Sequence, residues 1–367
     1  MISNLFARSA ESRASVISGG HPSNFLSFMA GADSFSGVEV SESNAMTFTA
    51  VYSAVRILSE GLAQPPLKLY RKRKDGGRDE AFDEPEYYLA RHEPNPETTS
   101  FIFRELCQGH LCTWGNAYAE IVFNGAGRAM ALWQRRPDRV TIERGASGGL
   151  TYRIDRAEGD TDVLPAERVL HVPGLSFSGY VGISPIRMAR EAIGLGLATE
   201  RHGSVYFGNG SRPGGVLEHP ARLGEGIADN LRGQWTEMHQ GVNKSNRVAI
   251  LEEGMTWKQI GLPMDDSQFL QTRRFQIEEI ARVFRIPPHM MADLERATFS
   301  NIEHQDLEFQ KYTMGPWYVR WEAELNRKIL GRRRMDQGYF FKFDNRAFLR
   351  GDVKSRTEAY TAGRNGG

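Results

Sequence analysis

Two long amphipathic segments bracket a short mixed segment in the middle of the chain, and this arrangement constrains the fold more than any other feature. The first, residues 184–208, starts with a serine that can cap a helix and a proline that fits its first turn. The second, residues 265–290, has apolar residues at helical spacing until Pro287-Pro288 ends the helix. Because one helix leads away and the other returns, residues 209–264 are predicted to form a separate small unit of strands and a helix.

Glycine recurs inside the first of these helices, at Gly194, Gly196 and Gly203. Each interior glycine costs about 0.8–1 kcal/mol relative to alanine, so the repetition indicates that another backbone packs close by. On the same helix, Arg187 and Glu191 have the spacing of an ion pair.

The rest of the chain mixes helices with short strands, which predicts an α+β fold. Three predicted helices between residues 45 and 113 precede a series of strands between 117 and 172, in which Asn124-Gly125 is typical of a hairpin turn. Residues 1–43 contain 11 Ser and no Lys, and we interpret them as an arm that orders only against a partner. Other expected elements are strands over 214–217, 247–251, 256–260 and 338–343 and helices over 226–239 and 351–362.

A long helix is predicted over residues 301–330. Ser300 and Glu303 have the spacing of a capping box at its start. Gly315-Pro316 falls in its middle, where proline removes one backbone hydrogen bond and clashes with the preceding turn. We therefore expect the helix to be kinked at these two residues.

Charge and hydropathy exclude two classes of protein. The chain carries 46 Lys and Arg against 45 Asp and Glu, a net charge of +1, which excludes a strongly basic protein that wraps nucleic acid. No apolar run approaches the roughly 18 residues that span a bilayer. A concentrated basic run, residues 71–74, adjoins the turn sequence Asp75-Gly76-Gly77, so we favour a solvated loop over a nucleic-acid patch there.

Sequence signatures of catalysis are absent. Residues 241–245 resemble the end of a phosphate-binding loop, but Asn243 replaces a required glycine, and residues 174–178 depart from a nucleophile elbow at the last position. The nine histidines are dispersed, and Cys107 and Cys112 alone make neither a disulfide framework nor a good zinc site. We therefore predict no catalytic residue, no metal and no cofactor, and two reduced thiols within a helix.

Short motifs nevertheless follow one another in a specific order. They are T-A-V-Y-S-A-V-R from Thr49, H-E-P-N-P from His92, W-G-N-A-Y from Trp114, G-I-S-P-I from Gly182, F-G-N-G-S-R-P-G-G from Phe207, L-E-E-G-M from Leu251 and I-A-R-V-F-R-I-P-P from Ile280. In this order they resemble the portal proteins of tailed bacteriophages of the HK97 type, whose close relatives occur in gene transfer agents. The resemblance covers about residues 44–363.

The resemblance implies a structural protein rather than an enzyme. Portal subunits form a ring, expected to contain twelve copies, at one capsid vertex, and the ring is a channel for packaging and ejecting double-stranded DNA. The implied partners are further copies of the chain, the major capsid protein, the terminase large subunit, a head–tail connector or adaptor, and double-stranded DNA bound without sequence preference, with no membrane involved. The implied location is the portal vertex of the virion, after assembly in the cytoplasm of a bacterial host.

Carried over to this chain, the portal fold divides it into eight parts. They are a flexible N-terminal arm (1–43), an α+β wing (44–183), the first stem helix (184–208), an α/β clip (209–264), the second stem helix (265–290), a tunnel loop (291–300), a long kinked helix (301–330), and a C-terminal wing strand with the start of a crown (331–367). The helical crown of the family is expected to be small or absent here.

The resemblance places the DNA channel at the tunnel loop. Residues 267–330 include nine basic and nine acidic side chains, and such a balanced lining would hold DNA weakly and without base readout. We favour a channel position for Arg296, whereas Ser300 is better explained as a helix cap. The implied channel residues are Glu295, Arg296, Thr298, Phe299, Ser300 and Asn301.

Two further sets of residues, three arginines and four tryptophans, each allow two interpretations of their role. Arg332, Arg333 and Arg334 lie in a C-terminal segment with nine basic and four acidic residues, and they either face DNA or form a solvated turn. Four tryptophans are candidate subunit contacts, because aromatic residues are enriched at interfaces, with core packing as the equal alternative. They are Trp235, Trp257, Trp317 and Trp321.

Two other functions remain as alternatives. One is a monomeric adaptor that binds a capsid vertex without forming a pore. The other is a hydrolase with an unrecognised pair of acidic residues. Particle size separates a ring from a monomer, and turnover of DNA, ATP or peptide would reveal a hydrolase.

Overall fold

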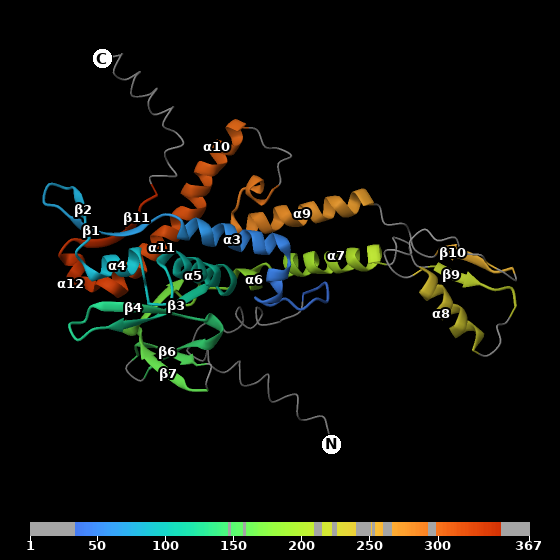
Figure 1. Cartoon of the computed structure of the whole chain (residues 1–367), viewed down its shortest axis with the longest axis horizontal. Helices are drawn as coiled ribbons and strands as arrows, with labels where there is room; N and C mark the ends of the chain where they lie inside the picture. The colour runs from blue at the N-terminus through green and yellow to red at the C-terminus, as the bar shows by residue number, and fades with distance from the viewer. Residues whose placement is uncertain are drawn as a thin grey trace, which may run out of the picture. The chain divides into compact units, whose positions relative to one another are not determined.

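The computed structural model of the protein contains two compact units, each built from separate stretches of the chain (Figure 1). The first unit contains residues 40–190 and 280–345, and the second contains residues 34–39 and 191–279. The residues that the structure describes are 34–145, 148–156, 159–208, 215–221, 226–239, 251, 254–259, 266–292 and 299–345. Within these ranges no helix has the length and apolar character needed to cross a membrane.

Two helices form the centre of the first unit. After the 3-10 turn η2 (Asn44–Thr47), α3 (Thr49–Ala63) buries Val51, Val55, Leu58 and Leu62 along one face, at the spacing that the sequence predicts. Helix α5 (Ser100–Trp114) packs against it, and the short α4 (Pro85–Arg91) lies against both α5 and a neighbouring strand.

Three small antiparallel sheets complete the first unit, in the orders β11-β1-β2, β4-β3-β8 and β5-β6-β7. The first sheet joins distant parts of the chain, because Leu69 of β1 lies opposite Phe341 of β11. The strands are β1 (Leu67–Lys72), β2 (Arg78–Glu80), β3 (Asn116–Phe123), β4 (Ala129–Arg135), β5 (Val140–Arg144), β6 (Leu150–Asp155), β7 (Thr161–Pro165), β8 (Val169–Pro173) and β11 (Tyr339–Phe343). β2 and β7 have too weak an apolar alternation to be predicted. The strands β3, β4, β5, β6, β8 and β11 confirm those predicted between residues 117 and 172 and over 338–343.

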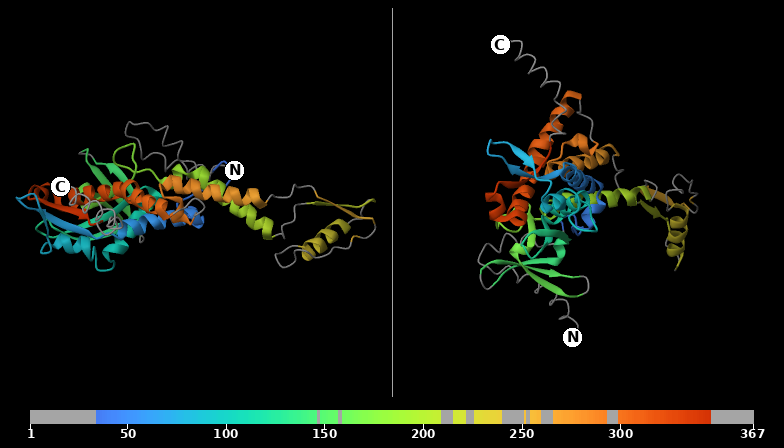
Figure 2. Two further views of the ribbon diagram at one scale, coloured as in Figure 1. Left: turned by 90° about the horizontal axis from the view of Figure 1, so that it is seen from above. Right: turned by 60° about the vertical axis from the view of Figure 1, so that its left-hand side comes forward.

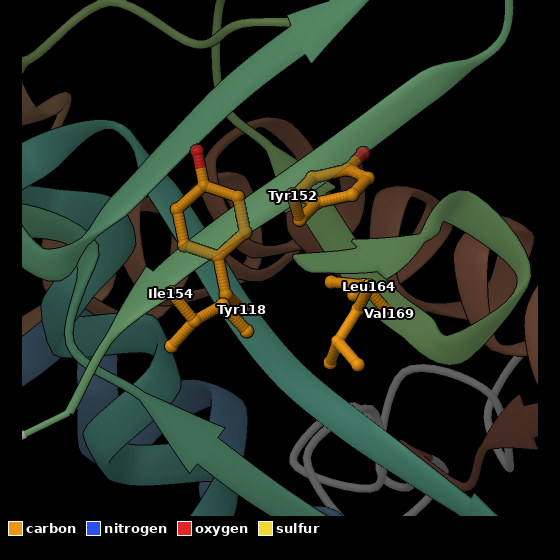
Figure 3. Close-up of a cluster of buried hydrophobic side chains, with 5 residues drawn as sticks. All are labelled: Tyr118, Tyr152, Ile154, Leu164 and Val169. Carbon is orange, nitrogen blue, oxygen red and sulfur yellow. The ribbon is translucent and has the colours of Figure 1, made fainter. Parts of the chain in front are cut away.

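A buried cluster holds the second and third sheets together (Figure 3). Tyr118 and Val169 come from β3 and β8, and Tyr152, Ile154 and Leu164 come from β6 and β7. The Tyr118 and Tyr152 rings meet edge to face at a centroid distance of 6.0 Å. Two sheets that would each leave one face exposed thus share a core.

The second unit pairs two helices and a small sheet. Helix α7 (Arg190–Gly208) lies beside α9 (Asp266–Phe284), and Gln276 donates a 3.0 Å hydrogen bond to Thr199 between them (Figure 1). A Cβ at Gly203 would lie 2.6 Å from the Phe269 ring, so a side chain fills the space beside this glycine, not the backbone that we predicted. Between these helices the chain forms β9 (Gly215–Glu218), which pairs with β10 (Thr256–Gln259), and α8 (Ile227–His239).

The predicted long helix is interrupted by two π-helical turns. Its segments are α10 (Phe299–Glu308), the π-helical η7 (Phe309–Met314), α11 (Gly315–Leu325) and the π-helical η8 (Asn326–Leu330). It ends at Leu330 as predicted, because Gly331 has φ of 63°, and a short helix α12 (Gly331–Asp336) follows. Because α10 begins at Phe299, Ser300 lies within its first turn and does not precede the helix as the capping-box prediction requires.

Three other expectations differ from the structure. The first predicted stem helix is divided at Ala189 into α6 (Pro185–Met188) and α7, although Ser184 caps it as predicted, with its Oγ accepting from Arg187 N. Arg187 pairs with Glu42 at 3.0 Å and not with Glu191, which accepts a hydrogen bond from the Phe35 backbone. Order begins before residue 44, since Ser34 and Val40 are buried against the chain itself.

Some expected elements lie outside the described residues. These are the strand over 247–251, apart from residue 251, the helix over 351–362 with the start of the crown, and the N-terminal arm through residue 33.

Candidate functional site

The segment expected to form the tunnel loop follows an unusual helix end. Helix α9 ends in a Schellman motif, in which Ile286 N donates to Ala281 O at 2.8 Å and Arg285 N donates to Arg282 O at 3.2 Å. The residue in the left-handed position of this motif is Arg285, with φ of 57°. Glycine is the usual residue at this position because it adopts a positive φ without steric strain. Arg285 is exposed, so core packing does not require an arginine here, yet the backbone bears the strain of a positive φ.

A histidine closes the base of the same loop. The 3-10 turn η6 (Pro288–Met291) places His289 Nε2 3.0 Å from Asp306 Oδ1 and its Nδ1 2.6 Å from Gln305 Oε1, both on α10. Because α10 follows residues 293–298, these contacts join the two ends of the loop. Ala292, the last described residue before it, also has a positive φ, of 64°.

The π-helical turn η7 provides a third support. Thr313 Oγ1 donates a 2.6 Å hydrogen bond to the carbonyl of Arg285, so the unusual helix end is held from the side. Gly315 N donates to Gln310 O, the i to i−5 pattern of a π-helix. Pro316 has no N–H to donate, and the wider turn directly precedes it. The disturbance predicted at Gly315 and Pro316 therefore takes the form of a π-helical turn.

The predicted channel residues are only partly placed. Glu295, Arg296 and Thr298 lie outside the described residues, and Phe299, Ser300 and Asn301 occupy the first turn of α10, with side chains that are not described. Sequence patterns missed His289, whose position after Pro287-Pro288 was the available signal. A lone histidine is more often a surface residue than a structural contact, so the sequence alone assigns it no role.

We expect His289→Ala to loosen the base of the loop without unfolding the protein. Loss of the two side-chain hydrogen bonds should cost about 1–2 kcal/mol locally. Hydrogen exchange should accelerate at backbone amides of residues 289–292 and 299–306. His304→Ala is the matched control, because His304 is exposed on the same helix. Equal exchange in the two variants would show that the His289 contacts do not hold the loop.

Two of the motifs that carry the family resemblance meet at the start of α6. Gly115 ends α5 with φ of 76°, and a Cβ there would lie 2.2 Å from Ile183 O. A Cβ at Gly182 would lie 1.9 Å from Gly115 O. Ser184 Oγ, the cap of α6, donates to Thr113 O at 2.6 Å. The W-G-N-A-Y and G-I-S-P-I motifs are therefore two halves of one backbone contact.

Asn116 connects this contact to a buried polar group. Its side chain accepts from Gly182 N at 2.7 Å and donates to Gly182 O at 2.8 Å, which fixes the orientation of the amide. His171 Nε2, 3.1 Å from Asn116 Oδ1, must carry the proton, and Nδ1 then accepts from Tyr152 OH at 3.1 Å. Burial, with the nearby charges of Lys328 and Arg327, lowers the pKa of His171 to about 3, so this histidine is neutral.

A group of opposite charges anchors the C-terminal elements. Glu84 and Glu86, at the start of α4, both accept from Arg128 of the β3–β4 hairpin. Arg334 of α12 lies 2.8 Å from Glu84 and stacks on Tyr339, with Cζ 3.8 Å from the ring centroid. Burial alone would raise the pKa of Glu84, but hydrogen bonds from Tyr339, Arg128 and Arg334 outweigh it and lower the pKa to about 2.

The three consecutive arginines are therefore not equivalent. Arg334 belongs to this partly buried group, whereas the Arg332 side chain is 94% exposed and Arg333 is also exposed. All three lie in the short helix α12. A role in facing DNA stays a prediction for Arg332 and Arg333, and the structure gives Arg334 an internal partner.

The four candidate tryptophans differ in how deeply they are buried. Trp321 is 1% exposed and donates to Gln108 Oε1 at 3.1 Å, so it packs in the core of the subunit and is not an interface anchor. Trp317 is half-buried on α11, and Trp257 is 39% exposed on β10. The side chain of Trp235, on α8, is not described.

Cys107 and Cys112 are free thiols buried in α5, and burial raises the pKa of each to about 12. Among the described residues, no group of three or more His, Cys, Asp or Glu side chains is arranged to hold a metal ion.

Comparison with known proteins gives a consistent result. A family model described as phage portal protein matches residues 49–367. The probable portal protein of Streptomyces phage phiC31 is 35% identical over 346 residues, which cover 91% of this chain and 74% of that protein. The portal protein of Enterobacteria phage HK97 is 30% identical over 324 residues, which cover 86% and 75%.

Solved structures agree on the fold. An HK97-family phage portal protein from Corynebacterium diphtheriae superposes with a TM-score of 0.64 at 18% identity, covering 84% of this chain and 96% of that one. A chain from the neck of a native gene transfer agent particle, computed with C12 symmetry, superposes with a TM-score of 0.61 at 22% identity, covering 87% and 89%.

Proposed function

Because the chain belongs to the phage portal protein family, we propose that its copies close into a ring, expected to contain twelve, at one capsid vertex and that double-stranded DNA passes through this ring. The family match over residues 49–367 carries the proposal, because it extends across both units. The neck structure with C12 symmetry supports a ring of this chain's fold.

The tunnel loop is the element that we propose to line the channel. Support comes from its base, where Arg285, His289 and Thr313 hold both flanking helices. A loop tethered at both ends keeps its position while DNA slides past it. The equal numbers of acidic and basic residues over 267–330 keep that contact weak, since tight binding needs net neutralisation of phosphates.

Three protein partners follow from the same assignment. We propose that the wing contacts the major capsid protein and that the insert between α7 and α9 contacts the terminase large subunit and, later, the head–tail connector. Assembly would take place in the cytoplasm of a bacterial host. No catalytic step is part of this proposal.

The size of the purified protein tests the ring. Light scattering should give a mass near twelve times 41.3 kDa, and negative-stain images should show rings with a central hole. A protein that stays at the monomer mass when mixed with the major capsid protein, but binds capsids, would instead support the adaptor function.

We expect Arg296→Ala to leave the ring intact and to change DNA packaging or retention. The reason is that a cation in the proposed tunnel loop would contact phosphates, while the ring depends on other surfaces. Packaged DNA per particle measures the effect. Arg156→Ala is the control, because Arg156 pairs with Asp162 on the surface of β6 and β7. Unchanged packaging in Arg296→Ala would remove this residue from the channel.

A further inference from the structure

The hairpin of β1 and β2 carries more cations than its carboxylates neutralise. Its three acidic residues are already engaged, since Asp75 and Asp79 lie 3.2 and 3.5 Å from Arg73 and Glu80 lies 2.7 Å from Lys68. Four cations of the same hairpin form no ion pair with any described residue. They are Arg71, Lys72, Lys74 and Arg78.

The sheet forces two of these cations together. Lys72 lies directly opposite Arg78 in the antiparallel register, and like charges at such positions repel each other. Aromatic rings hold both side chains in place: Lys72 Nζ lies 5.9 Å from the Phe340 centroid, and Arg78 Cζ lies 4.6 Å from the Tyr70 centroid. The two rings are themselves stacked at 5.7 Å. The ring contacts therefore keep Lys72 and Arg78 next to each other despite their repulsion.

Three other surface arginines of the same unit do have carboxylate partners. In the sheet of β5, β6 and β7, Arg153 lies 3.2 Å from Glu143 and Arg156 lies 2.5 Å from Asp162, and nearby Arg136 lies 2.8 Å from Asp138. These three cations have local carboxylates, whereas in the described part of the chain Arg71, Lys72, Lys74 and Arg78 of the hairpin do not. The difference indicates that an anion from another molecule neutralises the unpaired cations of the hairpin.

Two more exposed cations lie at the same end of the first unit. Helix α12, which carries Arg332 and Arg333, packs against β11, the strand beside β1. Figures 1 and 2 both show α12 next to the sheet from which the hairpin projects. The cationic surface therefore extends beyond the hairpin.

We propose that this surface, defined by Arg71, Lys72, Lys74 and Arg78, binds the phosphate backbone of double-stranded DNA outside the channel. Tyr70 is only 4% exposed, and the stacked rings already have cations over them, so they offer no face on which bases can stack. Residues 71–80 expose no large apolar side chain, and lysine is depleted at protein interfaces. These features favour a duplex read through its phosphates over single-stranded nucleic acid or an acidic protein.

A closed circular duplex tests this surface separately from the channel, because DNA without an end cannot thread through a closed ring. Binding of a relaxed fluorescent minicircle is measured from 50 to 200 mM salt with the assembled protein. The triple variant Lys72→Gln, Lys74→Gln and Arg78→Gln should bind about tenfold or more weakly at the lowest salt, with a shallower salt dependence. A control with the same loss of charge, Arg136→Gln, Arg153→Gln and Arg156→Gln, should bind like the wild type.

Equal binding by the triple variant and the wild type would overturn the proposal. Normal DNA binding combined with failed co-assembly with the major capsid protein would also overturn it, in favour of an acidic protein partner. If the triple variant does not fold, Lys74→Glu replaces it, because Lys74 is exposed in the turn and should weaken binding alone. Light scattering on the same samples reports ring formation, so failure of the ring and failure of this surface give different results.

Discussion

Gly182→Ala should destabilise the first unit by at least about 3 kcal/mol, which lowers its melting temperature by about 10 °C. The added Cβ would lie 1.9 Å from Gly115 O and 2.7 Å from Gly174 N, and both are backbone atoms. Neither can move without breaking the 2.8 Å hydrogen bond between Gly174 N and Gly115 O. Asn116 would also lose its paired contacts with residue 182. Thermal unfolding followed by circular dichroism measures the effect.

Gly125→Ala is the matched control for this substitution. Nothing lies within 4 Å of a Cβ built on Gly125, and its φ is not in the left-handed region. The control should therefore melt within about 2 °C of the wild type. If Gly182→Ala has the same melting temperature as Gly125→Ala, the backbone around residue 182 can move to accept a Cβ. The close approach of the two motifs would then not explain why they contain glycine.

Mild acid should destabilise the protein through two buried histidines. Burial lowers the pKa of His171 to about 3 and that of His110 to about 4, both from 6.5. Below pH 6.5 the unfolded chain takes up protons that the folded chain does not, so acid favours unfolding. Each histidine contributes at most about 1.4 kcal/mol per pH unit, and together they should remove up to about 4 kcal/mol between pH 6.5 and 5.

Denaturant unfolding at pH 7, 6 and 5 measures this slope. In a variant with His110→Gln and His171→Gln, stability should be lower at pH 7 but should change little between pH 6.5 and 5. Glu84, with its lowered pKa of about 2, adds its own loss only below about pH 4.5. The exposed His304→Gln serves as the control and should keep the wild-type slope. Parallel pH profiles for the double variant and the wild type would contradict the assignment.

The sequence predicted elements well where a local signal exists. Helix α5 and its end, the cap at Ser184 and the end of the long helix at Leu330 all depend on residues next to the boundary, and all are confirmed. The family resemblance, read from ordered motifs, is confirmed by the match over residues 49–367. The physical reason for two of those motifs, the mutual approach of Gly115 and Gly182, depends on residues 67 positions apart and is visible only in the fold.

Longer-range features were beyond sequence patterns for the same reason. Trp321 and Trp257 look alike in sequence, and only packing separates a core residue from a surface one. In the sequence, Arg334 is indistinguishable from Arg332. Only the fold places Glu84 and Glu86, from a distant part of the chain, beside Arg334. Spacing alone assigned Glu191 to Arg187, but Glu42, 145 residues away, is the actual partner.

The π-helical turn η7 sets the direction in which α10 presents its side chains. A π-helical turn holds one residue more than an α-helical turn, and one residue corresponds to a rotation of about 100° around the axis. The side chains of α10 are therefore rotated about the helix axis relative to the core-facing side of α11. Gln305 and Asp306 face His289 with this extra residue in place. The direction in which α10 presents these two side chains therefore depends on the number of residues in the helix behind them.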